Sequence, residues 1–348
     1  MKKYHSLTAF FLALLLVLPL GAVARADESG EAFSITAESA ILVEADTGEV
    51  LFELNPDARR YPASITKVMT GLLAVEAVER GDLSMDDVVT LGNDIYAGIG
   101  AGASTSGLQP GEMLTVRDLL NAALIPSANE ACNALATMVS GSIPAFVDLM
   151  NARAAELGMT GTHFANPHGY HDDDHYTTAR DIAAMCMEAM SHPEFRAIVS
   201  SGTYTIPATN LHEARELKDT NALVDGAKIR GYRYQYAIGI KTGFTTPAGY
   251  CLASAAEKNH RMLIGVLLGG KYFHDSSNNE IPDNYFTESR RLLEYGFNSF
   301  STKTVLDVID PVGTVPVSLC KEQDYITVLP AESISATLPN DLDPALFD

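Results

Sequence analysis

The sequence contains few of the residues that build metal sites or disulfide scaffolds. Its four cysteines, Cys132, Cys186, Cys251 and Cys320, lie far apart, which excludes the short-spaced patterns of zinc sites and thioredoxin-like pairs. Four cysteines in 348 residues are also too few for a disulfide scaffold. Because Cys132 and Cys251 have apolar neighbours in the sequence, we expect them to be small buried side chains.

Positive charge is also scarce. The chain has 24 Lys and Arg residues against 44 Asp and Glu residues, which gives a formal net charge of −20. A surface of this charge repels phosphate backbones and anionic lipid headgroups, so nucleic acid is not an expected partner. Hydrophobic residues make up 47% of the chain, which is an ordinary content for a globular protein with a large core.

Long apolar runs are missing after the N-terminal segment, so no later segment is predicted to span a membrane. The N-terminal run, from Phe10 to Leu20, follows Lys2 and Lys3 and precedes Ala24-Arg25-Ala26. A basic start, a short apolar run and small residues at the cleavage position are typical of a secretory signal peptide. We therefore predict that residues 1–26 direct export, so that the mature protein acts outside the cytoplasm, on the periplasmic or cell-wall side of the membrane.

The rest of the chain predicts helices between an early hairpin and a late group of strands. Two apolar runs around Asp46-Thr47-Gly48 predict a hairpin over residues 40–53. Apolar residues then recur at the helical period in six segments: 64–79, 115–124, 127–139, 142–158, 178–190 and 287–297. Three strand-like segments predict an antiparallel meander: 234–240, 250–256 and 262–268. This order favours an α+β fold, with helices packed on one antiparallel sheet that takes strands from both chain ends.

The pattern changes again after residue 300. Short strand-like segments at 305–309, 314–319 and 325–329 alternate with Pro and Gly, which predicts a small β-domain. Its strands are few for an independent sandwich, so it looks incomplete. We therefore divide the chain into the signal peptide, a main domain over residues 27–300, and the start of a C-terminal β-domain over residues 301–348.

Ser64 and Lys67 form the most informative motif, a Ser-x-x-Lys pattern at the start of a predicted helix. A serine hydroxyl needs a nearby base to act as a nucleophile, and residues three apart share a helix face. The positive end of the helix dipole favours a developing oxyanion and helps to lower the lysine pKa, so a neutral Lys67 can take the Ser64 proton. Short motifs also arise by chance, and the alternative is a capping serine beside a solvated lysine.

Two further motifs strengthen this interpretation. Ser127-Ala-Asn129 lies at a predicted break between helices, where Ser127 can relay a proton and Asn129 can hold a substrate amide. Lys241-Thr242-Gly243 is predicted to end a strand. There the lysine and threonine can bind a carboxylate, and the glycine lets a substrate lie close to the strand edge. Each motif alone has a plainer explanation as a helix cap or a strand end, but the ordered set of three is hard to obtain by chance.

The ordered set resembles the motifs of penicillin-binding proteins and β-lactamases. The chain is most similar to the low-molecular-mass penicillin-binding proteins, which are serine D-Ala-D-Ala carboxypeptidases. Four wider stretches carry the same resemblance: 40–53, 164–169, 175–181 and 239–249. The resemblance implies a β-lactamase/transpeptidase-like domain without a cofactor or metal. It also implies peptidoglycan stem peptides ending in D-Ala-D-Ala as substrates and β-lactams as covalent inhibitors.

The resemblance also implies roles for individual residues. Ser64 would attack the carbonyl of the penultimate D-Ala and release the terminal D-Ala, with Lys67 as the base. The backbone N–H groups of Ser64 and Phe244 would form the oxyanion hole. Lys241 and Thr242 would receive the terminal carboxylate, and water would then hydrolyse the acyl-enzyme.

Three features depart from the family pattern. Ala128 stands where many members have Gly, and Phe244 stands where many have His, which makes the rim of the site more apolar. Family members also commonly carry a longer β-domain and a C-terminal membrane helix, so we expect membrane contact only if an anchor exists beyond this chain.

Alternative functions stay open at this point. A class A β-lactamase needs a deacylating glutamate in a Glu-x-x-x-Asn pattern, and no glutamate between the second and third motifs has it. A D,D-endopeptidase of the same family has the same motifs, and a non-catalytic wall-binding module would need one of them broken. Asp172-Asp-Asp174, between His171 and His175, is expected to be a solvated acidic loop and not a metal site. His168 is expected to order its loop.

Overall fold

A five-stranded antiparallel sheet forms the centre of the protein. The computed structural model describes residues 33–272, 274, 281, 283–316 and 325–342, so the predicted signal peptide and Cys320 lie outside the described residues. The strand order is β2-β1-β9-β8-β7, which confirms a sheet built from both chain ends. The strands are β1 (Ser39–Glu44), β2 (Val50–Leu54), β7 (Ala237–Thr245), β8 (Gly249–Lys258) and β9 (Arg261–Gly270).

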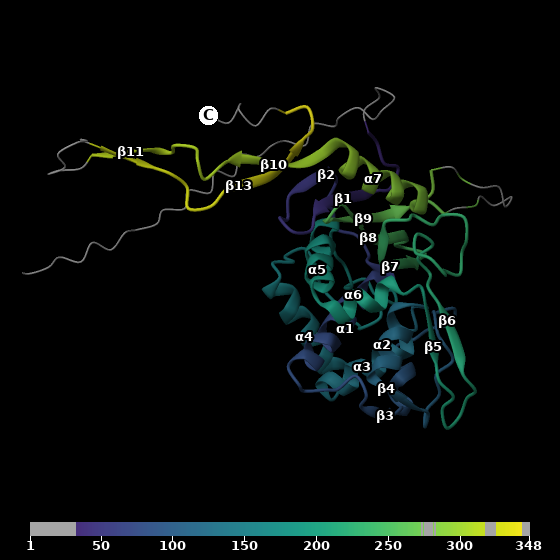
Figure 1. Ribbon diagram of the computed structural model, residues 1–348. Coiled ribbons are helices and arrows are strands. Elements are labelled where there is room, and N and C mark those ends of the chain that lie inside the picture. The colour runs from purple at the N-terminus through teal and green to yellow at the C-terminus, as the bar shows by residue number, and fades with distance from the viewer. Residues whose placement is uncertain (1–32, 273, 275–280, 282, 317–324, 343–348) are drawn as a thin grey trace, which may run out of the picture.

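Helices cover both faces of this sheet (Figure 1). One face carries the larger group, and α7 packs alone on the other against β8 and β9. The larger group surrounds α1, whose apolar residues are buried because helices enclose it on several sides. The helices are α1 (Lys67–Glu79), α2 (Val116–Leu124), α3 (Asn129–Ser140), α4 (Ile143–Glu156), α5 (Ala179–Ser191), α6 (Pro193–Ser200) and α7 (Tyr285–Ser299).

The helix starts follow the capping signals in the sequence. At the start of α2, the Thr115 side chain accepts a hydrogen bond from the N–H of Asp118, and the Asp118 carboxylate accepts one from the N–H of Thr115. Both N–H groups lack a partner inside the helix, so this pair of bonds satisfies them. The Thr178 side chain likewise accepts from the N–H of Asp181 at the start of α5, and Asn284 caps α7. The predicted helices and the meander are therefore confirmed, with shifts of a few residues at their ends.

Two predictions about elements of the main body need correction, and one helix was not predicted. The strand predicted to end at Lys241-Thr-Gly243 continues to Thr245, because pairing with β8 extends it through these residues. Ser127 does not belong to a helix: its φ is +73° and α3 begins at Asn129. The chain also forms α6, which was not predicted.

Short elements connect the larger ones. A 3-10 helix, η1 (Ala63–Thr66), leads into α1, and a second, η2 (Asn93–Tyr96), precedes a long loop. Two small antiparallel pairs lie outside the main sheet. The first joins β3 (Val88–Thr90) to β4 (Met113–Thr115), and the second joins β5 (Thr203–Ile206) to β6 (Arg215–Lys218).

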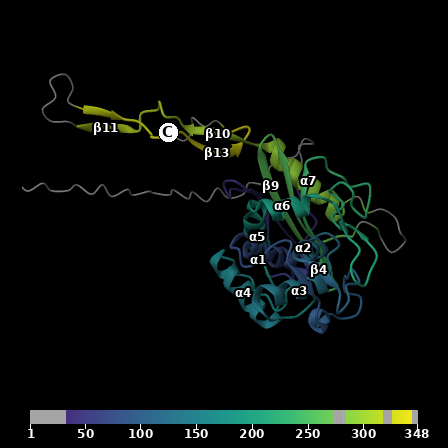
Figure 2. The same cartoon turned by 60° about the horizontal axis from the view of Figure 1, so that its bottom comes forward.

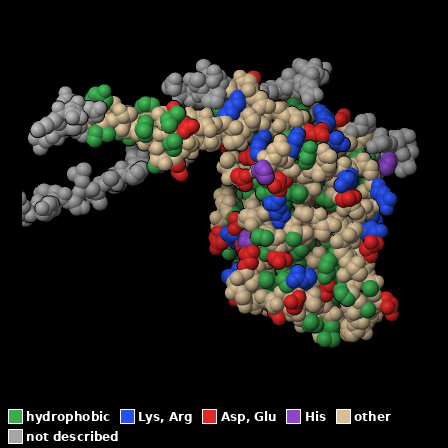
Figure 3. Space-filling view, viewed as in Figure 1, with side chains coloured by type: hydrophobic (Ala, Val, Ile, Leu, Met, Phe, Trp, Pro, Cys, Tyr) green, Lys and Arg blue, Asp and Glu red, His purple; other side chains and the backbone are tan. Residues whose placement is uncertain are grey.

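The C-terminal strands form an arm that projects from the main body (Figure 2). β10 (Phe300–Leu306) pairs with β13 (Ile334–Pro339), and β11 (Gly313–Pro316) pairs with β12 (Tyr325–Val328). The strand predicted at 305–309 was therefore placed too late, since β10 begins directly after α7. Hydrophobic side chains gather on this arm (Figure 3), where those on β11 and β12 are largely exposed.

Among the described helices, none is by itself long and apolar enough to cross a membrane. The pair α3 and α4 reaches the required length and composition only when taken together, and the two helices meet at an angle of 83°. Three of the cysteines, Cys132, Cys186 and Cys251, are free and buried, as expected for Cys132 and Cys251.

Candidate active site

A cavity of about 540 Å³ opens between the start of α1, the loop before α3 and the edge strand β7. The sequence motifs lie far apart in the chain, but the fold brings all of them to this cavity. Lys67 and Lys241 are fully buried behind its wall. The other residues predicted for the site line it: Ser64, Ser127, Asn129, Thr242, Gly243 and Phe244.

Ser64 and Lys67 are in hydrogen-bonding contact. The Nζ atom of Lys67 lies 2.8 Å from the Oγ atom of Ser64 and 2.6 Å from the carbonyl oxygen of His168. Burial lowers the pKa of Lys67 to about 7, and the positive charge of Lys241 contributes to this shift. A lysine with this pKa has a substantial neutral fraction at neutral pH, so it can accept the serine proton.

The loop over residues 163–177 holds Lys67 in place. The Oγ1 atom of Thr70 donates to the carbonyl oxygen of Pro167 at 2.5 Å, which fixes the loop on α1. The Oγ1 atom of Thr66 also lies 2.7 Å from Nε2 of His175. Because Pro167 adjoins His168 and Thr66 adjoins Lys67, these two contacts aim the loop carbonyl at the lysine.

The His168 ring itself serves the loop. Its Nδ1 atom accepts from the N–H of Tyr170 at 3.1 Å, and burial lowers its pKa to about 3. The ring is therefore neutral at pH 7 and orders the loop, as expected from the sequence. The acidic residues 172–174 are exposed, and they belong to no cluster of described side chains that lie close enough together to hold a metal ion.

One group with metal-like spacing does exist elsewhere in the described part of the chain, at Glu76, Glu188 and His192. The guanidinium of Arg153 already pairs with both carboxylates, at 2.7 Å from Glu76 and in close contact with Glu188. This group is therefore an ion-pair network between α1, α4 and α5.

Ser127 and Asn129 offer unused polar atoms to the cavity. Within the described residues, neither Oγ of Ser127 nor Oδ1 of Asn129 has a hydrogen-bond partner, although both side chains are buried. The positive φ of Ser127 turns the chain into α3, and the N–H of Asn129 donates to the carbonyl of Ser104 at 2.9 Å. Buried polar groups are normally paired, so these two atoms are suited to a ligand in the cavity.

Lys241 lies among hydroxyl groups. Its Nζ atom contacts the Thr242 carbonyl at 3.1 Å and Oγ1 of Thr220 at 3.4 Å, and the two threonine hydroxyls are 2.5 Å apart. Burial lowers the pKa of Lys241, and the nearby charge of Asp219 acts against that shift. Thr220 and Asp219 were not predicted as site residues, because no local motif distinguishes them from an ordinary turn after a strand.

Gly243 allows β7 to approach the nucleophile. A Cβ atom at this position would lie 3.0 Å from the carbonyl oxygen of Pro62 and 3.0 Å from the backbone nitrogen of Ser64. A side chain here would force the strand away from the start of α1. The glycine therefore brings the β7 backbone beside the Ser64 N–H group.

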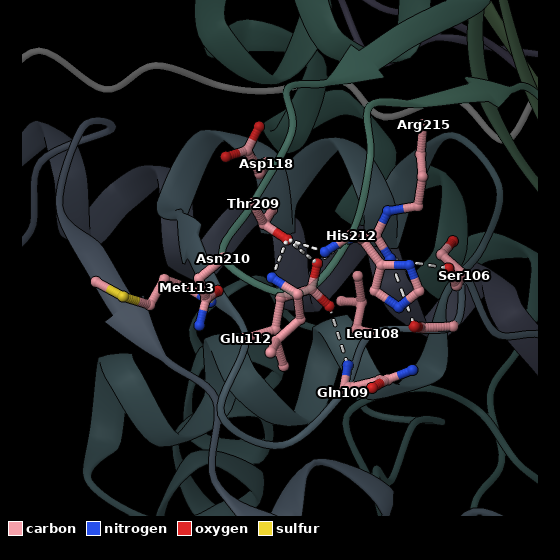
Figure 4. A network of polar contacts seen from close by, with 12 residues as sticks. Ser106, Leu108, Gln109, Glu112, Met113, Asp118, Thr209, Asn210, His212 and Arg215 are labelled. Carbon is pink, nitrogen blue, oxygen red and sulfur yellow. Dashed lines mark hydrogen bonds and ion pairs between the residues drawn. The ribbon is translucent and has the colours of Figure 1, made fainter.

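A polar network joins the β5–β6 hairpin to the loop that forms one wall of the cavity (Figure 4). The fully buried carboxylate of Glu112 accepts from Oγ1 of Thr209 at 2.9 Å and from the N–H of Gln109 at 3.1 Å. Arg215 pairs with the same carboxylate and also reaches the carbonyl of Ser106 at 3.4 Å. Because β6 leads directly to residues 219–221, this network positions Thr220 at the cavity.

Comparison with known proteins identifies the family. A family model described as D-alanyl-D-alanine carboxypeptidase matches residues 24–272. The D-alanyl-D-alanine carboxypeptidase DacF of Bacillus subtilis is 32% identical over 336 residues, which cover 96% of this chain and 81% of that protein. DacA of Escherichia coli K12 is 35% identical over 288 residues, which cover 81% of this chain and 66% of that protein.

Solved structures agree with this result. Penicillin-binding protein 5 from Haemophilus influenzae superposes with a TM-score of 0.72 at 28% identity, covering 89% of this chain and 84% of that one. A mutant of the Streptomyces K15 DD-transpeptidase gives a TM-score of 0.66 at 29% identity, covering 76% of this chain and 99% of that one. The expected α+β fold, a β-lactamase/transpeptidase-like domain with a small additional β-region, is confirmed. The chain belongs to the D-alanyl-D-alanine carboxypeptidase family of serine peptidases.

Proposed function

We propose that this protein removes the terminal D-Ala from peptidoglycan stem peptides through an acyl-enzyme on Ser64. The contact of 2.8 Å between Oγ of Ser64 and Nζ of the buried Lys67 carries this proposal, because it joins a nucleophile to a base that is partly neutral near pH 7. Membership of the carboxypeptidase family supports the substrate class.

Acylation uses groups that already surround the cavity. Lys67 takes the Oγ proton of Ser64 while Oγ bonds to the carbonyl carbon of the penultimate D-Ala. The backbone N–H groups of Ser64 and Phe244 stabilise the negative charge on the carbonyl oxygen. When the C–N bond breaks, the leaving D-Ala nitrogen receives a proton through Ser127, whose hydroxyl is free to relay it from Lys67.

Substrate binding uses the opposite end of the cavity. The terminal carboxylate lies beside Lys241 and accepts hydrogen bonds from the hydroxyls of Thr220 and Thr242, while Asn129 holds a substrate amide. In the second step Lys67 takes a proton from water, the new hydroxide attacks the ester carbonyl, and Ser64 leaves with its proton restored. β-Lactams acylate the same serine, and the enzyme acts outside the cytoplasm after export.

Labelling with a fluorescent penicillin tests the nucleophile. The intact protein should become covalently labelled, Ser64→Ala should not, and Ser191→Ala, which changes an exposed serine at the end of α5, should label normally. Labelled Ser64→Ala protein, or a folded wild-type protein that is never labelled, would contradict the assignment.

Release of D-Ala tests the reaction. We expect free D-Ala from a pentapeptide ending in D-Ala-D-Ala and none with Ser64→Ala. Cleavage of a cross-linked muropeptide without any release from the pentapeptide would instead identify a D,D-endopeptidase. Rapid turnover of penicillin would identify a β-lactamase.

A further inference from the structure

Glu130 is a fully buried carboxylate that directly follows the second motif, in the first turn of α3. It is not among the described residues that line the cavity, and it has no part in the acylation steps. We propose that Glu130 is a positioning residue, which fixes the loop that forms one wall of the cavity and sets a negative charge near Lys67. The proposal rests on the proposed function and adds to it a residue that acts without touching the substrate.

The loop over residues 97–108 is named here the wall loop. Its residues 101–104 line the cavity, where Ser127 and Asn129 also lie. All residues of the wall loop are described, and none of them belongs to a helix or a strand. Its position at the cavity therefore depends on the bonds that tie it to neighbouring elements.

The start of α3 ties the wall loop in place. The Oε1 atom of Glu130 accepts hydrogen bonds from the N–H of Ser106 at 2.7 Å and from the N–H of Leu108 at 3.3 Å. Beside it, the N–H of Asn129 donates to the carbonyl of Ser104 at 2.9 Å. Because adjacent residues of α3 hold residues 104–108, the carboxylate fixes the wall loop relative to the Asn129 side chain.

The charge of Glu130 also acts on the base. Burial raises the pKa of Glu130, while the backbone N–H groups that donate to it act to lower that pKa, since they favour the ionised carboxylate. The ionised carboxylate in turn acts to raise the pKa of Lys67, against the effect of burial. One side chain therefore connects the cavity wall with the protonation of the base.

Other charged or titratable groups around Glu130 and Lys67 come from several segments. They are Tyr96 of η2, Glu112 before β4, Cys132 of α3, His168 of the 163–177 loop, Arg215 of β6 and Lys241 of β7. Burial raises the pKa of Cys132 to about 12 and lowers that of His168 to about 3, so neither changes its charge near pH 7. The remaining groups are common to the wild type and to variants of Glu130, so a difference between these proteins reports on Glu130.

Two variants separate the contact from the charge. Glu130→Asp keeps the charge but shortens the side chain, so its bonds to Ser106 and Leu108 are lost. Glu130→Gln removes the charge but keeps an oxygen that can accept these bonds, and its amide nitrogen takes the place of Oε2, which has no partner among the described residues. Acylation by a fluorescent penicillin is then followed at several concentrations, which separates the apparent dissociation constant from the limiting rate.

Glu130→Asp tests the contact with the wall loop. The apparent dissociation constant for penicillin should rise about 10-fold, the order expected when hydrogen bonds to a charged group are lost. The limiting rate of acylation should stay within about twofold of the wild type, because no group that touches the reacting atoms changes. An unchanged apparent dissociation constant would overturn the positioning role.

Glu130→Gln tests the charge. Removal of a negative charge near Lys67 favours the neutral amine, so the midpoint of the acylation rate between about pH 5.5 and 9 should move to lower pH. At about pH 6 this variant should keep a larger fraction of its plateau rate than the wild type does. Glu130→Asp should keep the wild-type midpoint. A midpoint that is unchanged in Glu130→Gln, or that moves to higher pH, would overturn the effect of the charge on the base.

Glu288→Gln is the matched control, because Glu288 is also fully buried in the first turn of a helix. One of its oxygens accepts from the N–H of Thr36 and the other has no partner among the described residues, as at Glu130. It lies on α7, on the other face of the sheet. This variant should lose stability as Glu130→Gln does, but its apparent dissociation constant and its midpoint should match the wild type. Equal shifts of the midpoint in both variants would mean that the shift comes from general destabilisation, and would overturn the proposal.

The test is separable from that of the reaction. If penicillin acylates the wild type but no D-Ala is released from a pentapeptide, the proposed function is wrong, while both effects of Glu130 can still be measured. If D-Ala is released and both Glu130 variants behave as the wild type does, the function stands and the role of Glu130 is wrong.

Discussion

Lys67 shows at the scale of one residue how burial creates reactivity. A lysine in water holds its proton at pH 7, but this one has its pKa lowered to about 7 by burial, with a second buried lysine nearby. Its Nζ atom still has two oxygen partners, from Ser64 and His168, so the neutral amine is hydrogen-bonded. Perturbed lysines of this kind cluster at functional sites, because a base must be free of its proton at the working pH.

The rate of acylation should therefore depend on pH through Lys67. The neutral amine is the active form, so the second-order rate constant for penicillin acylation should rise as pH increases through about 7 and fall below it. Rates measured between about pH 5.5 and 9 will show this rise, because that range extends to both sides of the Lys67 pKa. A flat profile, or a rate that falls with rising pH over this range, would mean that Lys67 is not the base.

Replacement by arginine separates charge from reactivity. Lys67→Arg keeps a positive side chain that does not lose its proton in proteins, so acylation should fall by roughly 10²–10⁴-fold, the contribution typical of general base catalysis. Lys228→Arg, at an exposed position, is the matched control and should keep the wild-type rate. A Lys67→Arg enzyme with near-normal acylation would contradict the mechanism.

Asp219 is expected to support substrate binding through Lys241. Both groups are buried, and the Asp219 charge acts to raise the pKa of Lys241 against the effect of burial. Asp219→Asn removes this support, so more of Lys241 is neutral at about pH 8 and the substrate carboxylate loses its positive partner. We expect KM for a D-Ala-D-Ala peptide to rise about 10-fold, equal to about 1.4 kcal/mol. Asp225→Asn, at an exposed position, should not change KM, and an unchanged KM in Asp219→Asn would mean that Lys241 is held by other means.

At the scale of elements, the site depends on the contact between the 163–177 loop and the start of α1. The hydroxyls of Thr66 and Thr70 form hydrogen bonds with the loop, and Gly169 of the loop packs against the backbone of Ala63. The loop in turn supplies the carbonyl that holds Lys67. A displacement of the loop therefore changes the geometry of the nucleophile and its base together.

Gly169 offers a sharp test of this coupling. Its φ is +80°, and a Cβ atom there would lie 1.8 Å from the Ala63 carbonyl oxygen, so Gly169→Ala must push the loop away from η1. Acylation should fall by about 100-fold, in line with the loss expected when reacting groups are misplaced by an ångström. Gly81→Ala is the matched control: its φ is +79°, but no atom lies within 4 Å of the added methyl group.

Both glycine variants have the same backbone strain, of order 1–3 kcal/mol for a non-glycine residue in this conformation. Their free energies of unfolding should both decrease, and Gly169→Ala should decrease further because of its clash. If both variants keep the wild-type acylation rate, contact between the loop and η1 does not control the site.

At the scale of the whole molecule, the sequence predicted the parts with local signals. Capping residues such as Thr115 and Thr178 marked helix starts, and apolar runs marked the strands of the sheet. It did not predict the β5–β6 hairpin, which is held by the ion pair of the partly buried Arg215 with the buried Glu112, 103 residues earlier in the chain. Thr220 was missed for the same reason, since it reaches the cavity through tertiary contacts, among them its N–H bond to the Ile125 carbonyl at 3.3 Å.

The three motifs predicted which residues form the site, but they did not predict how the chain brings these residues together. The sheet takes its strands from both ends of the main domain, so β7 and the start of α1 become neighbours (Figure 1). Sequence reasoning could not find the exact packing of Gly243 against Ser64 or the His168 carbonyl at Lys67. Both depend on the complete set of contacts.

The position of the cavity in the body of the protein, away from the C-terminal arm, gives a last prediction. Among the described residues, those that line the cavity lie between Ser64 and Tyr285, before the arm begins. The match to the Streptomyces K15 DD-transpeptidase mutant takes up 99% of that chain but only 76% of this one, so a protein of this fold exists without counterparts for the remaining residues. The arm contacts the body through few described groups, among them the N–H of Thr337, which donates to Glu49 at 2.8 Å.

A variant that ends at Phe300 should therefore fold and acylate with penicillin at a rate within about twofold of the full chain, since no group that touches the reacting atoms is removed. Phe300 is kept because its ring packs against Tyr295 in the core below α7. The melting temperature should fall modestly, because the buried Leu338 and the Thr337 contact are lost. A folded truncated protein that acylates more than about tenfold slower would show that the arm supports the active site, and that the two predicted domains act as one unit.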